Sequence, residues 1–320
     1  MLTVIESSDA TFQQHWHTLL DNDPLQNPLY KSKLARSTSS REGQSLHESY
    51  TDRSFVVVAQ DKPVFGCSLT LHTDQQGRKC LGYFGLDAYT HVNRASLNTP
   101  SNNFNPEAIR LLQQHIQQLL DEERPEAVDF LDPVSCGVMS PMTQVLLQQG
   151  GRPTVHKVEV VDLTKPSEEL LAAVSPDYRE MLTWGQDNLQ FSVVYSDRGL
   201  EESLLNQLDA IAPHSSANYL GNCLDLLRQG QGFLVQVEDK GMLVASALCV
   251  YSQRTCQFVF GEPIAEGYGG LVMPIMVWRA IQEAKALGCK QFDFGIVLDR
   301  DDVNPQQFGG LTHTRLKITL

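Results

Sequence analysis

The most regular pattern of hydrophobic and polar positions in the chain lies between residues 233 and 295. Three β-rich runs come first, and they read FLVQVED, MLVASALCVYS and CQFVFGE. The first two meet at Asp239-Lys240-Gly241, a short connection that is typical of a β-hairpin. A glycine-containing loop, a helix and a fourth strand follow without an insertion. The pattern therefore predicts three strands, a loop, a helix and a strand, in that order.

The predicted helix carries its hydrophobic residues at the spacing of one buried face. They are Val277, Ala280, Ile281, Ala284 and Leu287, and Gly288 ends the helix before a strand from Gln291 to Ile296. Pro274 suits a first helical turn, so we expect the helix to begin at about Met273. The preceding loop, Gly267-Tyr268-Gly269-Gly270, presents backbone N–H groups near the start of the helix. Phosphate groups bind at such positions.

The first half of the chain repeats this order of elements. The pattern predicts a helix over 9–20, a polar excursion over 21–53 and strands from Phe55 in FVVVAQ, VFGCSLTL and KCLGYFGL. It then predicts a helix over 106–123, a strand over 127–131, a shorter helix over 141–149 and a strand over 155–161. The Ser-rich part of the excursion, from Tyr30 to Tyr50, is typical of an irregular surface segment, and a loop beside the substrate is the alternative.

A fixed offset between the halves also aligns several identical residues. Setting Phe55 against Phe233 aligns Val57 with Val235, Asp61 with Asp239, Lys62 with Lys240 and Ser68 with Ser246. The shared order of strands, helix and strand indicates a duplicated domain. We expect the boundary in residues 162–167, which divides the chain into an N-terminal domain, 1–161, and a C-terminal domain, 162–320.

The glycine loop between a strand and a helix resembles the acyl-CoA N-acyltransferase (GNAT) fold. In that fold the pyrophosphate of coenzyme A lies on a Gly-x-Gly loop, which implies a donor site at Gly267, Gly269 and Gly270. The sequence departs from the full signature at Ile264, where the family has Gln or Arg, and Glu266 places a negative charge beside the loop. A plain strand-to-helix turn is the alternative for these glycines.

Two further segments resemble one branch of that fold, the peptidoglycan-bridge-forming (FemAB-like) aminoacyltransferases and their polysaccharide-biosynthesis relatives. Ser175 and Pro176 suit the cap and first turn of a helix in which Arg179, Leu182 and Gly185 match the branch. The strand Phe292-Asp293-Phe294-Gly295, with Phe308-Gly309-Gly310 downstream, is similar to its terminal signature. The second arginine of the helix is replaced by Thr183. The resemblance implies an α+β fold of two tandem GNAT-like domains, each a mixed, mainly antiparallel sheet flanked by helices.

Composition and charge restrict the partners that we expect. The formal net charge of −13 and the lack of clustered Lys and Arg disfavour nucleic acid, including a tRNA donor, and favour a small thioester. The sequence has no stretch of roughly 18 apolar residues and no secretory signal, which predicts a cytoplasmic protein without membrane insertion. Its seven cysteines form no C-x-x-C pair, so we expect buried reduced thiols and no metal site.

The acid–base candidates are carboxylates near the proposed donor site. An alkylammonium acceptor must lose a proton before it attacks a thioester, and Glu262, just past the third strand, is the first candidate. Asp293 is the second, although its alternation with phenylalanines also fits a solvent-facing position. Tyr268 could protonate the leaving thiolate or pack over the loop. Backbone N–H groups over 258–261, which include Phe260 and Gly261, could bind the thioester carbonyl.

The sequence therefore predicts an N-acyltransferase that moves an acyl group from acyl-CoA to a small amine acceptor. The resemblance implies an amino sugar, an amino acid or a cell-envelope precursor as that acceptor. One alternative keeps the aminoacyl-tRNA donor of the bridge-forming branch, and another is a non-catalytic module that retains the fold. Arg315 and Lys317, which alternate along a final strand, could meet a phosphate or carboxylate, or lie on a solvated face.

Overall fold

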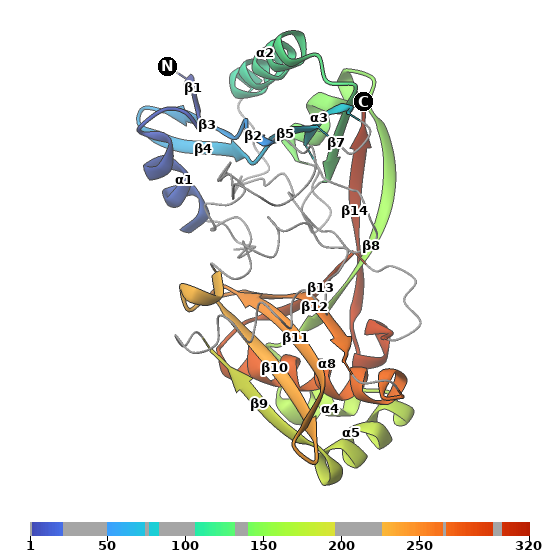
Figure 1. The fold of residues 1–320 in the computed structure, drawn as a ribbon. Coiled ribbons are helices and arrows are strands. Elements are labelled where there is room, and N and C mark those ends of the chain that lie inside the picture. Colours follow the sequence, from blue (N-terminus) through green and yellow to red (C-terminus); the bar gives the residue numbers. More distant parts are fainter. Residues whose placement is uncertain are drawn as a thin grey trace.

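The computed structural model describes residues 2–21, 50–73, 77–82, 106–131, 140–195, 226–264, 267–296 and 303–320. Two lobes lie one above the other in Figure 1, and the paired strands β8 (Arg152–Asp162) and β14 (Leu311–Thr319) join them. We call these lobes the N-terminal and C-terminal lobes. The described strands form an 11-stranded ladder in the order β2-β5-β6-β7-β14-β8-β13-β12-β11-β10-β9, together with a three-stranded sheet, β1-β3-β4.

In the described residues, the N-terminal lobe is built from eight strands and three helices. The strands are β1 (Leu2–Glu6), β2 (Tyr50–Asp52), β3 (Phe55–Ala59), β4 (Lys62–Cys67), β5 (Thr70–Thr73), β6 (Lys79–Gly82), β7 (Ala127–Leu131) and β8 (Arg152–Asp162). The helices are α1 (Phe12–Asp21), α2 (Pro106–Glu123) and α3 (Pro141–Gln148). The strand expected in VFGCSLTL divides at Ser68 and Leu69, because β4 belongs to the small sheet and β5 to the long ladder.

The C-terminal lobe contains the elements that the hydrophobic pattern predicted most sharply. Its strands are β9 (Gln190–Val194), β10 (Gly232–Asp239), β11 (Met242–Tyr251), β12 (Thr255–Pro263), β13 (Gln291–Ile296) and β14 (Leu311–Thr319). Its helices are α4 (Ser167–Ala173), α5 (Pro176–Asn188), α8 (Gly269–Ala286) and the 3₁₀ helix η3 (Pro305–Phe308). The pattern did not predict α4 or β9.

Both lobes contain the same hairpin, which supports the duplication. In each hairpin the two turn residues have positive φ, Gln60 and Asp61 between β3 and β4, and Lys240 and Gly241 between β10 and β11. Each hairpin also has one extra residue on its second strand, Val64 in one and Val244 in the other. This correspondence is shifted by two residues from the alignment of identities, so Ser68 and Ser246 are not equivalent positions.

The last strand of the chain connects the two lobes. β14 runs antiparallel to β8, from Leu311 opposite Val160 to Thr319 opposite Arg152, and its end also pairs with β7. Ile318 is fully buried in the same hydrophobic cluster as Phe130 and Val145 of the N-terminal lobe. The C-terminal strand is therefore part of the N-terminal core, although the division of the chain at 162–167 remains a proposal.

Each lobe has its own hydrophobic core. In the C-terminal lobe, α8 buries Val277, Ala280, Ile281 and Ala284 completely against the sheet, which confirms the predicted face of this helix. In the N-terminal lobe, α2 buries Leu112, Ile116 and Leu119 in a separate cluster. The five described cysteines are buried free thiols. In the described residues, no helix has the length and apolar character required to cross a membrane.

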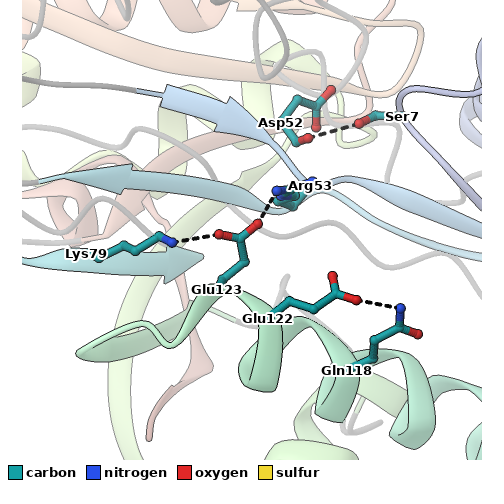
Figure 2. A network of polar contacts seen from close by, with 7 residues as sticks. All are labelled: Ser7, Asp52, Arg53, Lys79, Gln118, Glu122 and Glu123. Atoms are coloured by element: carbon teal, nitrogen blue, oxygen red, sulfur yellow. Dashed lines mark hydrogen bonds and ion pairs between the residues drawn. The ribbon is translucent and has the colours of Figure 1, made fainter.

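An ion-pair network links the end of α2 to the ladder. Glu123 lies between Arg53, just past β2, and Lys79 of β6, and it pairs with both side chains (Figure 2). The distance from Lys79 Nζ to Glu123 Oε2 is 2.7 Å. The Lys79 hydrogen bond contributes most to a lowered pKa of the Glu123 carboxyl. The network therefore joins the C-terminal end of α2 to two neighbouring segments of the N-terminal lobe.

Candidate functional site

The candidate site begins where β12 and β13 separate. The two strands are parallel neighbours only from Thr255 to Gln257 on β12 and from Gln291 to Asp293 on β13. Beyond these residues β12 continues beside β11, while β13 continues beside β8. No register pair joins the two strands further along in the part of the chain that the structure describes. The ladder therefore opens between two of its central strands.

β12 is bulged where the ladder opens. Phe258 lies opposite Cys249 and Phe260 opposite Leu248, so one extra residue, Val259, interrupts the pairing. A bulge bends a strand and removes backbone groups from the regular ladder. Gly261 follows immediately, and a Cβ atom there would lie 2.7 Å from Phe258 Cζ and 2.8 Å from Met276 Cε. The glycine thus allows β12 to pack closely on α8 beside the opening.

The glycine loop leads directly into α8, which begins at Gly269 and not at Met273. Pro274 consequently lies inside the helix, where it cannot donate to the carbonyl of Gly270. Tyr268 is the N-cap residue, and its side chain makes no capping hydrogen bond. A Cβ atom on Gly270 would meet nothing within 4 Å. The N-terminus of α8 therefore has no side-chain cap, and the space beside Gly270 is open, which together favour anion binding.

Tyr268 is held by the hairpin at the other side of the loop. Its hydroxyl donates a hydrogen bond of 2.6 Å to Asp239 Oδ2 at the end of β10. This bond is the main reason why the pKa of the tyrosine is raised. The ring also packs at the edge of the C-terminal core. These contacts agree with the packing role, because the phenolic proton is directed to a carboxylate of the protein.

Asp293 is buried, so the solvent-facing alternative for this residue is wrong. Its side chain is 3% exposed, and its Oδ2 accepts a hydrogen bond of 2.9 Å from Nη2 of Arg315, which is equally buried. Its Oδ1 accepts the backbone N–H of Gly295 at 2.7 Å. The solvated alternative for Arg315 is therefore wrong, and the partner of Arg315 is a carboxylate of the protein. Lys317 lies two residues further along β14 and forms an ion pair with Asp129, with Nζ 3.2 Å from Oδ2.

For the remaining site residues, the strand register gives the backbone position. Glu262 lies on β12 opposite Ser246 of β11, and Phe260 lies on the same strand beside the bulge. The side chains of Glu262 and Phe260, and all of Glu266, lie outside the described residues. Gly261 and Glu262 thus lie on the β12 side of the opening, and the chain passes from them to the glycine loop. Asp293 lies on β13, at the point where the two strands part.

Helix α5, which carries the residues that match the FemAB-like branch, packs against α8. Ser175 accepts a hydrogen bond from the N–H of Tyr178, and Pro176 occupies the first turn, so the predicted cap is confirmed. Gly185 packs on α8, because a Cβ atom there would lie 2.7 Å from both Cδ1 and Cγ2 of Ile275. The sequence signature at Gly185 therefore marks a close helix contact. Alternation along the final strand predicted that Arg315 could meet a carboxylate, which is confirmed, but nothing in the sequence indicated that the carboxylate is Asp293 or that Asp239 holds Tyr268.

The described residues offer no obvious alternative chemistry. They contain no cluster of three His, Cys, Asp or Glu side chains that could hold a metal ion. Burial is the first cause of the raised pKa of the Cys256 and Cys289 thiols, and it brings the pKa of Cys289 to about 12. These thiols are therefore protonated at neutral pH and are poor nucleophiles.

A known family model matches part of the C-terminal lobe. Residues 185–302 match the model of the acetyltransferase (GNAT) domain. The matched segment contains the opening between β12 and β13, the glycine loop and α8. The recognition made from the glycine loop is therefore confirmed for this part of the chain. No curated protein matches the sequence.

Comparison with solved structures extends the fold to the whole chain. FemX has a TM-score of 0.67 at 12% identity, covering 98% of this chain and 96% of FemX. A tandem GNAT protein from the clavulanic acid biosynthesis pathway has a TM-score of 0.56 at 10% identity, covering 100% and 98%. The C-terminal domain of a lysylphosphatidylglycerol synthetase from Agrobacterium fabrum has a TM-score of 0.54 at 12% identity, covering 78% and 80%. The chain thus has the tandem GNAT fold, as the sequence predicted.

Proposed function

We propose that the protein is an N-acyltransferase that moves an acyl group from an acyl-CoA thioester to a small amine. The observation that carries this proposal is the opening between β12 and β13, with the glycine start of α8 next in the chain. The helix N-terminus would receive the pyrophosphate of the donor at Gly267, Gly269 and Gly270. The acyl group would then enter between the strands.

In the proposed reaction, the chain supplies positioning and one base. The amine loses a proton to Glu262, directly or through water, and attacks the thioester carbon. Backbone N–H groups over 258–261 would stabilise the oxyanion. The C–S bond then breaks, and the thiolate takes the second proton of the attacking nitrogen and leaves as CoA thiol. Holding the reactants in line contributes about 7–11 kcal/mol in a well-aligned site. We assign the base to Glu262 ahead of Asp293, because both oxygens of Asp293 are already engaged.

The acceptor and the cellular location belong to the same proposal. An amino sugar, an amino acid or a cell-envelope precursor would provide the amine, and the net charge of −13 favours the approach of a cationic acceptor. The same acidity argues against an aminoacyl-tRNA donor. Buried free thiols support a cytoplasmic location. We place the boundary between the tandem domains in residues 162–167, just after β8.

Ligand-induced stabilisation of the full chain tests the donor. We expect acetyl-CoA and CoA to raise the melting temperature, whereas charged tRNA leaves it unchanged. Gly269→Val should abolish the shift, because a bulky side chain then occupies the first turn of α8. Gly288→Asn, just past the other end of the same helix, is the matched control, since a Cβ atom there meets nothing within 4 Å and asparagine tolerates the φ of +84° better than other side chains. A response to charged tRNA alone would support the aminoacyl-tRNA alternative, and no response to any of the three ligands would favour a non-catalytic module.

Replacement of the proposed base tests the chemistry. Glu262→Gln removes basicity but keeps the size of the side chain, so turnover at neutral pH should fall by roughly 10²–10⁴. CoA binding should change little. Release of CoA thiol in the presence of a panel of amines measures the rate, and calorimetry measures the binding. A loss of turnover in Asp293→Asn at saturating donor, with an unchanged donor KM and a fully active Glu262→Gln, would reverse the assignment.

A further inference from the structure

β13 bends at the point where it leaves β12. The register between β13 and β8 shifts between Asp293, opposite Val160, and Ile296, opposite Val158. Gly295 lies inside this shift with φ of +78°, a conformation that glycine adopts without strain. Its N–H bonds to Asp293 Oδ1 two residues earlier, at 2.7 Å. The carboxylate of Asp293 therefore holds the bend from within the strand.

Arg315 fixes the other oxygen of the same carboxylate. Nη2 of Arg315 lies 2.9 Å from Asp293 Oδ2, and both side chains are 3% exposed. A charge-assisted hydrogen bond in such a buried place is short, directional and weakly screened by salt. Asp293 thus makes one contact that bends β13 and one that ties the bend to β14.

The strand that carries Arg315 is anchored in the other lobe. β14 pairs with β7, and Ile318, three residues beyond Arg315, is buried in the N-terminal core. Figure 1 shows β14 running from the C-terminal lobe up to the N-terminal lobe beside β8. The position of Arg315 is therefore set by packing in a lobe that does not contain the glycine loop.

We propose that Asp293 and Arg315 form a positioning pair that bends β13 away from β12 and so keeps the donor opening from closing. Two parallel strands continue to pair wherever their exposed edges stay within reach. A straight β13 would extend the ladder along β12 beyond Gln257, and the proposed acyl position would be lost. The pair prevents this extension. The role of this pair in donor access rests on the proposed function, whereas the bend in β13 does not.

Amide hydrogen exchange of the full chain without ligand tests the pair. In Asp293→Ala/Arg315→Met, the contacts of Asp293 with Gly295 and Arg315 are removed, and the two opposite charges of the pair are removed together. We expect the amides over 258–262 of β12 to exchange roughly tenfold more slowly, because the strands now pair there. If the pair only stabilises the fold, its removal should make the amides around β13 exchange faster and should not slow exchange on β12. Faster or unchanged exchange over 258–262 would overturn the proposal.

A matched control lies on the same strand. Lys317 is two residues beyond Arg315, and its ion pair with Asp129 links β14 to β7, away from the opening. The double variant Asp129→Ala/Lys317→Met should leave exchange over 258–262 unchanged. Gly295→Ala strains the bend but leaves the ion pair intact. It tests whether the bend keeps β13 from pairing with β12 if Asp293→Ala/Arg315→Met fails to fold. It should also protect the β12 amides.

Donor binding gives a second readout that separates the two proposals. If the open form falls to about a tenth of the molecules, the apparent Kd for CoA rises roughly tenfold in Asp293→Ala/Arg315→Met. The turnover number at saturating donor should change less than the KM. An unchanged Kd beside protected β12 amides would overturn the role in donor access. Failure of the wild-type protein to bind CoA would refute the proposed function, while the exchange result would still decide the bend.

Discussion

The helix contact at Gly185 yields the most quantitative prediction for this fold. Replacing Gly185 with alanine adds a Cβ atom 2.7 Å from Cδ1 and Cγ2 of Ile275 and 3.1 Å from its Cγ1. Carbon atoms in good contact are about 3.5–4.0 Å apart, so the new atom overlaps Ile275 by about 1 Å. Ile275 is 3% exposed in the C-terminal core, where neighbouring side chains restrict its movement.

Two opposing effects set the size of the change. Alanine in a helix interior is favoured over glycine by up to about 1 kcal/mol. Overpacking a filled core costs about 1–3 kcal/mol. The overlap involves both branches of Ile275, so a single rotation about χ1 does not relieve it, and we expect the packing cost to win. The net loss in the free energy of unfolding should be about 1–2 kcal/mol.

A double-mutant cycle in urea measures this prediction. Ile275→Ala removes all three overlapping atoms, so Gly185→Ala in that background should stabilise the protein by up to about 1 kcal/mol. Gly270→Ala is the control, because its Cβ atom meets nothing within 4 Å and should cause no packing loss. The reasoning is refuted if Gly185→Ala stabilises the wild-type protein, or if its cost is the same in both backgrounds.

Two further predictions concern charged and phenolic groups. The pKa of Glu123 is lowered in the folded state, chiefly by Lys79, so its stabilisation is present above the ordinary value of 4.5 and is lost as the pH falls through the folded value. The difference in melting temperature between wild type and Glu123→Gln should shrink below about pH 4.5, and a constant difference would contradict this. Tyr268→Phe removes the bond to Asp239, so the donor KM should rise while the turnover number stays near that of wild type. A large loss of turnover would instead indicate that Tyr268 acts as an acid.

The local parts of the fold could be read from the sequence, because neighbours along the chain determine them. The hairpin at Lys240-Gly241 needs two residues with positive φ. The helix cap at Ser175 needs only a hydroxyl and a proline after it. The buried face of α8 follows from the periodicity of its own residues. The predicted start of α8, at about Met273, was wrong because the helix begins at Gly269 and accommodates Pro274 in its interior.

The candidate site shows the limit of that reading. Glu262 and the glycine loop were proposed as site residues because they follow one another in the chain between a strand and a helix. Asp293 alternates with phenylalanines, a pattern that equally fits a solvated residue, and nothing nearby in the sequence reveals that Arg315 covers it. The division of one predicted strand at Ser68 has a similar origin, since the two pieces join different sheets.

The sequence by itself therefore determined most of the order of the elements, the presence of the two hairpins and the glycine entry to α8, since each depends on backbone preferences and periodicity within about 20 residues. The tertiary structure decided which strands separate, which carboxylate is buried and which lobe holds the C-terminal strand. Those features depend on pairings between residues far apart in the chain, such as β14 with β7. A pairing of that kind becomes favourable only when the whole ladder is assembled, because distant segments gain contact energy only after the chain has closed the loop between them.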